Sequence, residues 1–216
     1  MKFPIFSKSK LLILALLLIT STIFSQKKAT NNILIIDNTK SMIGFRGSEA
    51  IWSDVKAYII QYVSNQVKIG EVVTIYTFAT KLSDPVSFTI NSKNDKERVE
   101  NYINALQATG LTTCIANALE NSIASLDKNQ ENIIMLFTDG DENCTTDFTT
   151  LKKQYNIHKS DIKDIYFIPF NPAVLPYKTD MDIIVGDVRK PIEVPKPIEV
   201  PKPKATKKTF NIIKIN

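Results

Sequence analysis

Two runs of apolar residues, each leading into an aspartate, constrain the fold of this 216-residue chain more than any other feature. The runs read NNILIID at 31–37 and NIIMLFTDG at 132–140. Continuous apolar runs of this length are typical of strands that are buried on both faces of a parallel sheet. Such a sheet must be covered by helices on both sides.

The rest of the middle of the chain alternates between strand and helix patterns. Ser48 is expected to cap a helix whose apolar residues recur at helical spacing from Ile51 to Val63. Further strands are predicted at 71–78, 86–90 and 161–170, and further helices at 94–107, 113–126 and near 146–158. The predicted fold class is therefore α/β, with an open, mostly parallel, Rossmann-like sheet and helices on both faces.

Oxygen-bearing side chains gather where the two apolar strands end. Asp37 and Asp139 each follow one strand, and in such sheets ligands bind at the carboxyl ends of the strands. Thr39 and Ser41 follow Asp37 at alternating positions, and Thr113 begins a helix after a loop that contains glycine. Carboxylate and hydroxyl oxygens suit Mg²⁺ or Mn²⁺, and Ca²⁺ less well. Two carboxylates, rather than four, would leave such an ion able to accept an acidic ligand from outside.

Three motifs carry a resemblance to a known family. They are D-N-T-K-S-M from Asp37, T-T-C-I-A-N-A-L-E from Thr112 and L-F-T-D-G from Leu136. In their order and spacing, they make the chain resemble the von Willebrand factor type A family and its metal-ion-dependent adhesion site. The resemblance covers about residues 31–170 and implies that family's fold.

The resemblance also implies a role for each of the five oxygen-bearing residues. Thr39 and Ser41 would contact the metal through their hydroxyls, and Thr113 would contact it directly or through water. Asp37 and Asp139 would hold it mainly through water. The competing interpretation is that Asp37, Ser41 and Thr113 only cap helices.

Three features depart from the family pattern. Thr39 replaces the commoner serine but keeps the hydroxyl. Lys40 stands where glycine is frequent, which adds a cation near the ion. Leu111 and Thr112 replace a pair of small residues, so the loop before Thr113 is expected to be stiffer.

The amino terminus and the cysteines indicate export. Residues 1–25 hold three lysines, nine consecutive apolar residues at 11–19 and a small residue at Ser25, as in a secretory signal peptide. Cleavage after Ser25 is predicted, with an uncleaved anchor as the alternative because Ile23 suits the cleavage site less well than alanine. The expected location is therefore secreted or periplasmic. In that oxidising space Cys114 and Cys144, whose loops the resemblance brings together, are expected to form a disulfide rather than two separate thiols.

The net charge of +5 is unevenly distributed along the chain. Residues 26–187 hold 16 basic and 20 acidic residues, so a nucleic-acid-binding fold is disfavoured. The carboxyl-terminal residues, 188–216, are rich in lysine and proline, and the hexapeptide PIEVPK occurs there twice, at 191–196 and 197–202. Proline at this density predicts extended, polyproline-like chain, interpreted as a solvated linker or as a basic strip that contacts the envelope.

The predicted organisation is thus a signal peptide at 1–25, a von Willebrand factor type A domain at 26–187 and a tail at 188–216. The favoured function is non-enzymatic: binding of a protein partner whose carboxylate completes the coordination of a divalent ion. Phe45 and Arg46 are candidates for the rim that faces this ligand, or only loop residues. A metal-assisted hydrolase is disfavoured because no general base stands out, and the only histidine, His158, is interpreted as a surface residue. A structural envelope protein that acts through its tail is the third possibility.

Overall fold

A five-stranded sheet forms the centre of the protein, whose computed structural model describes residues 28–139, 142–144 and 147–169. The predicted signal peptide and tail lie outside the described residues. The strands are β1 (Thr30–Asp37), β2 (Val72–Phe78), β3 (Val86–Thr89), β4 (Glu131–Thr138) and β5 (Ile162–Pro169). Their order across the sheet is β3-β2-β1-β4-β5, and only the β2–β3 pair is antiparallel.

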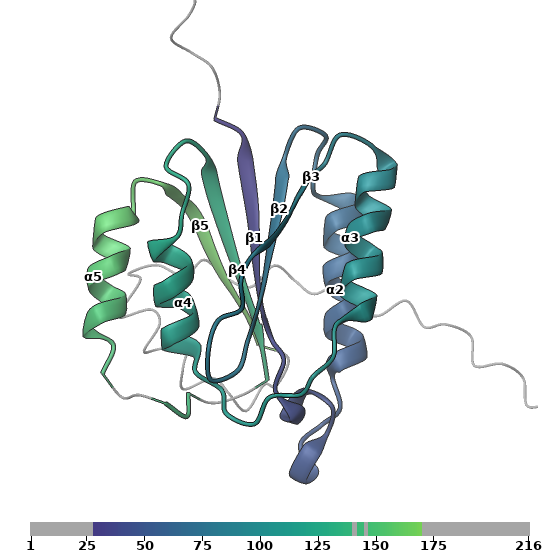
Figure 1. Cartoon of the computed structure of the whole chain (residues 1–216), viewed down its shortest axis with the longest axis vertical. Helices are drawn as coiled ribbons and strands as arrows, with labels where there is room; N and C mark the ends of the chain where they lie inside the picture. Colours follow the sequence, from purple (N-terminus) through teal and green to yellow (C-terminus); the bar gives the residue numbers. More distant parts are fainter. Residues whose placement is uncertain (1–27, 140–141, 145–146, 170–216) are drawn as a thin grey trace, which may run out of the picture.

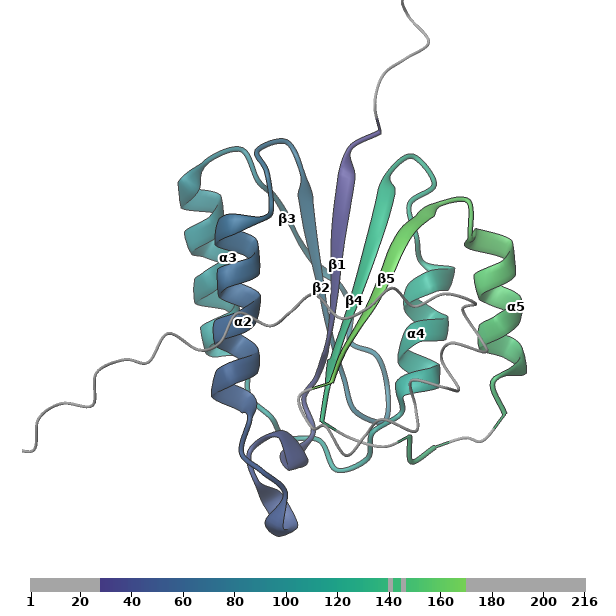
Figure 2. The same cartoon turned by 180° about the vertical axis from the view of Figure 1, so that it is seen from behind.

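Within the described residues, α-helices α2 to α5 cover the sheet, two on each face, as Figures 1 and 2 show. The helices are α2 (Trp52–Asn65), α3 (Lys93–Ala105), α4 (Ile115–Ala124) and α5 (Thr149–His158). Helices α2 and α3 lie on one face, and α4 and α5 lie on the other. The predicted α/β class, with a mostly parallel sheet covered on both sides, is confirmed.

Strand β1 divides the core into two halves because its side chains alternate between the faces. Leu34 and Ile36 pack with the α2–α3 side, whereas Ile33 and Ile35 pack with the α4–α5 side. All four residues are buried, as is the whole of β1. This double burial explains why the segment reads as a continuous apolar run.

The order of the strands creates a switch point between β1 and β4. From β1 the chain crosses through α2 to β2 on one side, and later returns through α4 to β4 on the other side of β1. Loops that leave such a pair of strands diverge and open a crevice at their carboxyl ends. Asp37 ends β1 and Asp139 follows β4, so the fold brings both carboxylates to this crevice.

Two short 3₁₀ turns, η1 (Lys40–Met42) and η2 (Phe45–Gly47), separate β1 from α2. Ser48 does not cap α2, and that prediction is wrong: the N-cap position is Ile51, and the Ser48 hydroxyl instead donates to the carbonyl oxygens of Ser41 and Phe45, at 2.7 and 3.0 Å. The side chain was expected to serve the helix but stabilises the turn before it.

His158 is the last residue of α5 and is buried, with 8% of its surface exposed, so its interpretation as a surface residue is wrong. Its Nδ1 atom lies 4.0 Å from a carboxylate oxygen of Asp161. No helix within the described residues is both long and apolar enough to cross a membrane.

Candidate metal centre

Asp37 lies at the bottom of the candidate site and is fully buried at the end of β1. One carboxylate oxygen accepts the backbone N–H of Thr39 at 2.9 Å, and the other accepts the hydroxyl of Thr138 at 2.6 Å. Thr138 is the last residue of β4, so the Asp37 carboxylate connects the ends of the two central strands. Sequence analysis missed this role of Thr138, although the T-D-G motif contains it.

The other four predicted residues form a continuous chain of hydrogen bonds above Asp37. The Thr113 hydroxyl donates to the Thr39 hydroxyl at 3.4 Å, and the Thr39 and Ser41 hydroxyls are 2.8 Å apart. Ser41 donates to a carboxylate oxygen of Asp139 at 3.0 Å. The three hydroxyls and the Asp139 carboxylate are thus joined in one line of contacts.

The loop that carries Thr113 is bound to the loop after β1 through backbone contacts. The N–H groups of Thr109 and Gly110 both donate to the Asn38 carbonyl, at 2.7 and 3.0 Å. The Lys40 N–H donates in turn to the Gly110 carbonyl at 2.8 Å. A Cβ atom at Gly110 would clash with the Cβ of Ala79, so only glycine fits this close approach. Gly110 thus fixes the distance between the two hydroxyl-bearing loops.

A disulfide between Cys114 and Cys144 ties the same loop to the segment after β4, with the two Cα atoms 5.1 Å apart. Next to it, the Asn143 N–H donates to the Thr113 carbonyl at 2.9 Å. The Glu142 carboxylate accepts the N–H of Ala116 in the first turn of α4 and that of Cys144, each at 2.7 Å. The structure has the predicted pairing of the cysteines. The contribution of Glu142 was missed, because it depends on a contact across 26 residues of sequence.

Burial raises the pKa of the Asp37 carboxyl from 3.8 to about 6. The hydrogen bonds from Thr138 and Thr39 oppose this shift, and the negative charge of Asp139 adds to it. The crevice therefore holds two like charges in a poorly solvated place, which is the environment that a bound cation relieves.

The rim of the crevice combines apolar and cationic side chains. Phe45 in η2 is 45% exposed, and the Lys40 ammonium and the Arg46 guanidinium lie 5.7 and 5.3 Å from its ring centroid. Ile43 and Leu111 are also exposed, at 49% and 73%. Both predicted rim residues, Phe45 and Arg46, therefore belong to the turn that follows the hydroxyl-bearing loop.

The donor set fits a hard divalent cation. It offers two carboxylates and three hydroxyls, and each hydroxyl oxygen retains lone-pair capacity after the hydrogen bonds described above. No group of three or more His, Cys, Asp or Glu side chains that could hold a metal occurs among the described residues. The five candidate donors are all oxygens, unlike the cysteine and histidine ligands of zinc-finger sites.

The comparisons with known proteins agree with this geometry. Residues 32–142 match the sequence profile of the von Willebrand factor type A domain. No curated protein is significantly similar to the chain in sequence.

Three solved structures illustrate the structural likeness. The PilB minor pilin from Streptococcus sanguinis superposes with a TM-score of 0.58 at 12% identity, over 78% of this chain and 58% of the pilin. Proximal thread matrix protein 1 from the mussel byssus, with a zinc-occupied MIDAS motif, gives 0.51 at 15%, over 67% and 39%. An aerotolerance-related membrane protein from Bacteroides fragilis gives 0.51 at 14%, over 65% and 67%. At these identities the likeness is one of fold, and this chain spans about two fifths of the byssus protein.

Proposed function

The chain belongs to the von Willebrand factor type A family, and we propose that it binds a protein partner through a divalent metal ion whose coordination a partner carboxylate completes. One observation carries the proposal. Five oxygen-bearing side chains from three separate loops converge on one crevice, in hydrogen-bond contact along Thr113, Thr39, Ser41 and Asp139, with Asp37 buried beneath them.

The residues that would hold the ion are those five, and Mg²⁺ or Mn²⁺ fits them best because all five donors are hard oxygens. When bound, the ion supplies an electrophilic position for a carboxylate oxygen. The hydroxyl chain is already oriented by Asp139, and the backbone contacts of Gly110 hold the two loops at a fixed distance. The site is thus organised before any ligand arrives. The zinc-occupied MIDAS motif of the byssus protein supports divalent-ion binding by analogy.

The rim favours an acidic partner. Lys40 and Arg46 lie beside the crevice and attract a carboxylate, while Phe45 and Leu111 offer exposed apolar surface to the residues around it. Exposed aromatic and arginine side chains are the residue types that dominate protein–protein contacts. We expect Phe45→Ala to weaken capture of the partner while leaving metal affinity unchanged.

The position of the single histidine supports a binding role over hydrolysis. The only imidazole of the chain, that of His158, lies at the opposite edge of the sheet, because α5 ends where β5 begins. We therefore expect no turnover of generic phosphate or ester substrates by the purified, metal-loaded protein. The proposed location is secreted or periplasmic, supported by the disulfide and the amino-terminal sequence.

Thermal melts across a Mg²⁺ and Mn²⁺ titration test metal binding. An ion at 100 times its dissociation constant stabilises the folded state by about 2.7 kcal/mol, which raises Tm by roughly 5–10 °C for a domain of this size. Asp139→Ala should abolish the rise and leave the metal-free Tm at or above that of the wild type, since a repulsive charge is removed. Asp84→Ala, at an exposed loop position, is the matched control and should behave as the wild type. No metal-dependent rise for the wild type at millimolar ion would refute the proposal.

Capture from envelope extract tests the partner. Immobilised protein should retain a partner with Mg²⁺ and release it with EDTA, and Asp139→Ala should retain none. Modification of the partner's carboxyl groups by amidation should also abolish capture. Metal binding in the melts with no metal-dependent capture would leave the site intact and overturn the adhesive role.

A further inference from the structure

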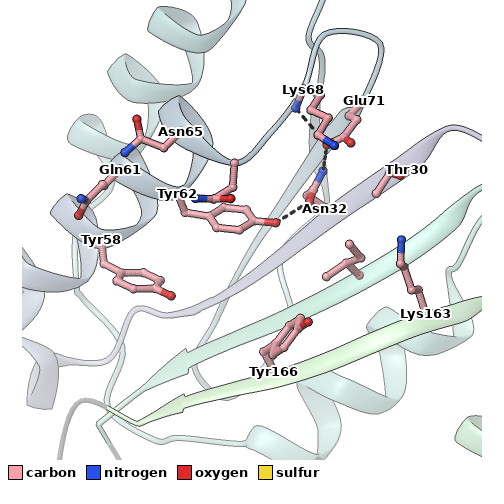
Figure 3. A pocket seen from close by; sticks show the side chains of 12 residues that line it. Thr30, Asn32, Tyr58, Gln61, Tyr62, Asn65, Lys68, Glu71, Lys163 and Tyr166 are labelled. Atoms are coloured by element: carbon pink, nitrogen blue, oxygen red, sulfur yellow. Dashed lines mark hydrogen bonds between the residues drawn. The ribbon is translucent and has the colours of Figure 1, made fainter. Parts of the chain in front are cut away.

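A second cavity lies far from the metal centre, at the amino ends of the strands, where α2 faces β1, β4 and β5 (Figure 3). Its volume is about 460 Å³, within the range of pockets that bind ligands. Three tyrosine rings line it, those of Tyr58 and Tyr62 from α2 and that of Tyr166 from β5. Its outer edge is made by amide and ammonium groups, among them Asn65 and Lys68.

One ring of the aromatic wall, that of Tyr62, is held by partly buried hydrogen bonds. The Tyr62 hydroxyl donates to Asn32 in β1 at 2.6 Å, and the Asn32 amide donates to Glu71 at 3.2 Å. Glu71 also accepts the Lys68 N–H at 3.1 Å. The network connects α2, β1 and the loop before β2, so contacts within the protein hold the Tyr62 ring in position.

We propose that this cavity, hereafter the tyrosine pocket, binds the PIEVPK repeat of the same chain in a polyproline II conformation. That conformation has three residues per turn, so every third side chain shares one face. In the repeat, one face reads Pro191, Val194, Pro197, Val200 and the next reads Ile192, Pro195, Ile198, Pro201. The third face reads Glu193, Lys196, Glu199, Lys202. The repeat is thus amphipathic at the polyproline period, with two apolar faces and one charged face.

The chemistry of the tyrosine pocket matches such a segment. Polyproline segments dock in aromatic-lined grooves, where their apolar ridges lie between rings. Their backbone carbonyls make no internal hydrogen bonds and accept bonds from donors on the groove. The exposed side chains of Gln61, Asn65 and Lys68 supply such donors at the edge of the pocket. An all-apolar segment would bury these groups without partners, which is costly.

The chain can reach the pocket. Strand β5 ends at Pro169 on the metal edge, about 26 Å from the opposite edge for a strand of eight residues. The 21 residues between Pro169 and Pro191 span up to about 70 Å when extended. One repeat of six residues measures about 19 Å as polyproline II.

A composition-matched exchange tests the proposal on the full chain. In each repeat the glutamate and the valine that follows it are exchanged, Glu193 with Val194 and Glu199 with Val200, so that PIEVPK becomes PIVEPK. The exchange keeps every proline and every charge but places a carboxylate on an apolar face. Compared with the wild type, we expect the amide NMR signals of Tyr58, Tyr62 and Tyr166 to shift. Signals at the metal edge, such as those of Ser41 and Thr113, should not move. The wild-type shifts should be independent of protein concentration, because the occupant belongs to the same chain.

Synthetic peptides then complete the test. PIEVPKPIEVPK added to the exchanged protein should return the pocket signals toward their wild-type positions, and PIVEPKPIVEPK should not. Asn65→Arg, which crowds the edge of the pocket, should weaken peptide binding about tenfold or more, equivalent to about 1.4 kcal/mol. Asn156→Arg on α5, an exposed helical position away from the pocket, should not.

Several results would overturn the proposal. They are identical pocket signals in the wild type and the exchanged protein, equal binding of the two peptides, or shifts that depend on protein concentration, which would indicate a second copy. A last variant combines Ile183→Asp with Ile184→Asp, in the segment between Pro169 and the repeats. If the pocket signals respond to this variant and not to the exchange, the occupant is the segment around Ile183 and Ile184 and not the repeat.

Discussion

Asp37 and Asp139 bear the same functional group but play different parts in the metal centre. Asp37 is fully buried and accepts hydrogen bonds from Thr39 and from Thr138 at the end of β4, so it supports the fold and, in the proposed site, would also support the ion. Asp139 lies above it and orients the hydroxyl chain through Ser41. The sequence predicts the same role for both aspartates, but their contacts in the structure differ. Asp37→Ala would remove an acceptor of the Thr138 hydroxyl, whereas Asp37→Asn keeps one.

Asp37 should make the metal-free protein less stable as the pH rises. Its pKa is about 6 in the folded protein, against 3.8 for an exposed carboxyl, so the folded state holds the proton more tightly. The stabilisation by that proton is complete below about pH 4 and is lost as the pH rises through 6, by roughly 3 kcal/mol. Asp37→Asn removes this dependence.

Urea denaturation in EDTA between pH 4 and pH 7.5 measures the effect. The difference in unfolding free energy, wild type minus Asp37→Asn, isolates this carboxyl from the other titrating groups. We expect that difference to become more negative as the pH rises, with its midpoint between pH 4 and pH 6. A difference that is flat across this range would mean that Asp37 titrates normally.

At the scale of elements, the sequence predicted every strand and α-helix of the described region to within three residues at either end. It did so because the apolar positions of the sequence are the ones that the folded protein buries. The run at 31–37 became β1 at Thr30–Asp37, and the helix expected at 113–126 is α4 at Ile115–Ala124. The two 3₁₀ turns between Lys40 and Gly47 were not predicted. The second turn needs positive backbone φ at Gly44 and Arg46, and an arginine gives no sequence signal for that conformation.

Long-range polar contacts escaped prediction for a different reason. The Glu142 cap of α4 and the Asn32–Tyr62 bond of the tyrosine pocket join residues that are 26 and 30 positions apart. Neither pair has a characteristic spacing, because both depend on how separate elements pack. Asp37 and Asp139 could be placed together from the sequence because parallel strands bring their carboxyl ends to a common edge, whereas the candidate roles of Thr39, Ser41 and Thr113 came from the family resemblance.

Gly110 sets the distance between the loops that carry Thr39 and Thr113. Gly110→Ala should cost roughly 1–3 kcal/mol, since its Cβ would overlap Ala79 and force the loops apart. It should also reduce the metal-dependent rise in Tm. Ala79→Gly in the same protein removes the clash and should restore most of the metal response. A double-mutant cycle by denaturation and by metal titration measures this coupling. If the effects of Gly110→Ala and Ala79→Gly simply add, the close approach of Gly110 to Ala79 does not position the site.

The disulfide fixes the carboxyl side of the same loop. Closing the loop between Cys114 and Cys144 should stabilise the protein by roughly 3–4 kcal/mol if the bridge acts by restricting the unfolded chain. Replacement of both cysteines by serine should lower the unfolding free energy by that amount and weaken Mg²⁺ binding, because Thr113 adjoins the bridge. Alkylation of denatured, unreduced wild-type protein should label neither cysteine. Labelling of both would show that the bridge does not form in the exported protein.

At the scale of the whole molecule, the proposed functions occupy opposite ends of one sheet. The hydroxyl cluster lies at the carboxyl ends of the strands and the tyrosine pocket at their amino ends. Strand β1 belongs to both, because it carries Asn32 at one end and Asp37 at the other. The two proposed binding sites therefore do not overlap.

This separation predicts that the two sites are energetically independent. Asn32 and Asp37 stand five residues apart on β1, roughly 17 Å, and changes at sites so separated usually add to within about 0.5 kcal/mol. Asn65→Arg should leave the Mg²⁺-dependent rise in Tm unchanged, and Asp139→Ala should leave the affinity for PIEVPKPIEVPK unchanged. The double variant should show the sum of the two single effects. A metal response that falls when the peptide binds would instead show that β1 transmits a change between Asn32 and Asp37, so that occupancy of the pocket regulates the metal centre.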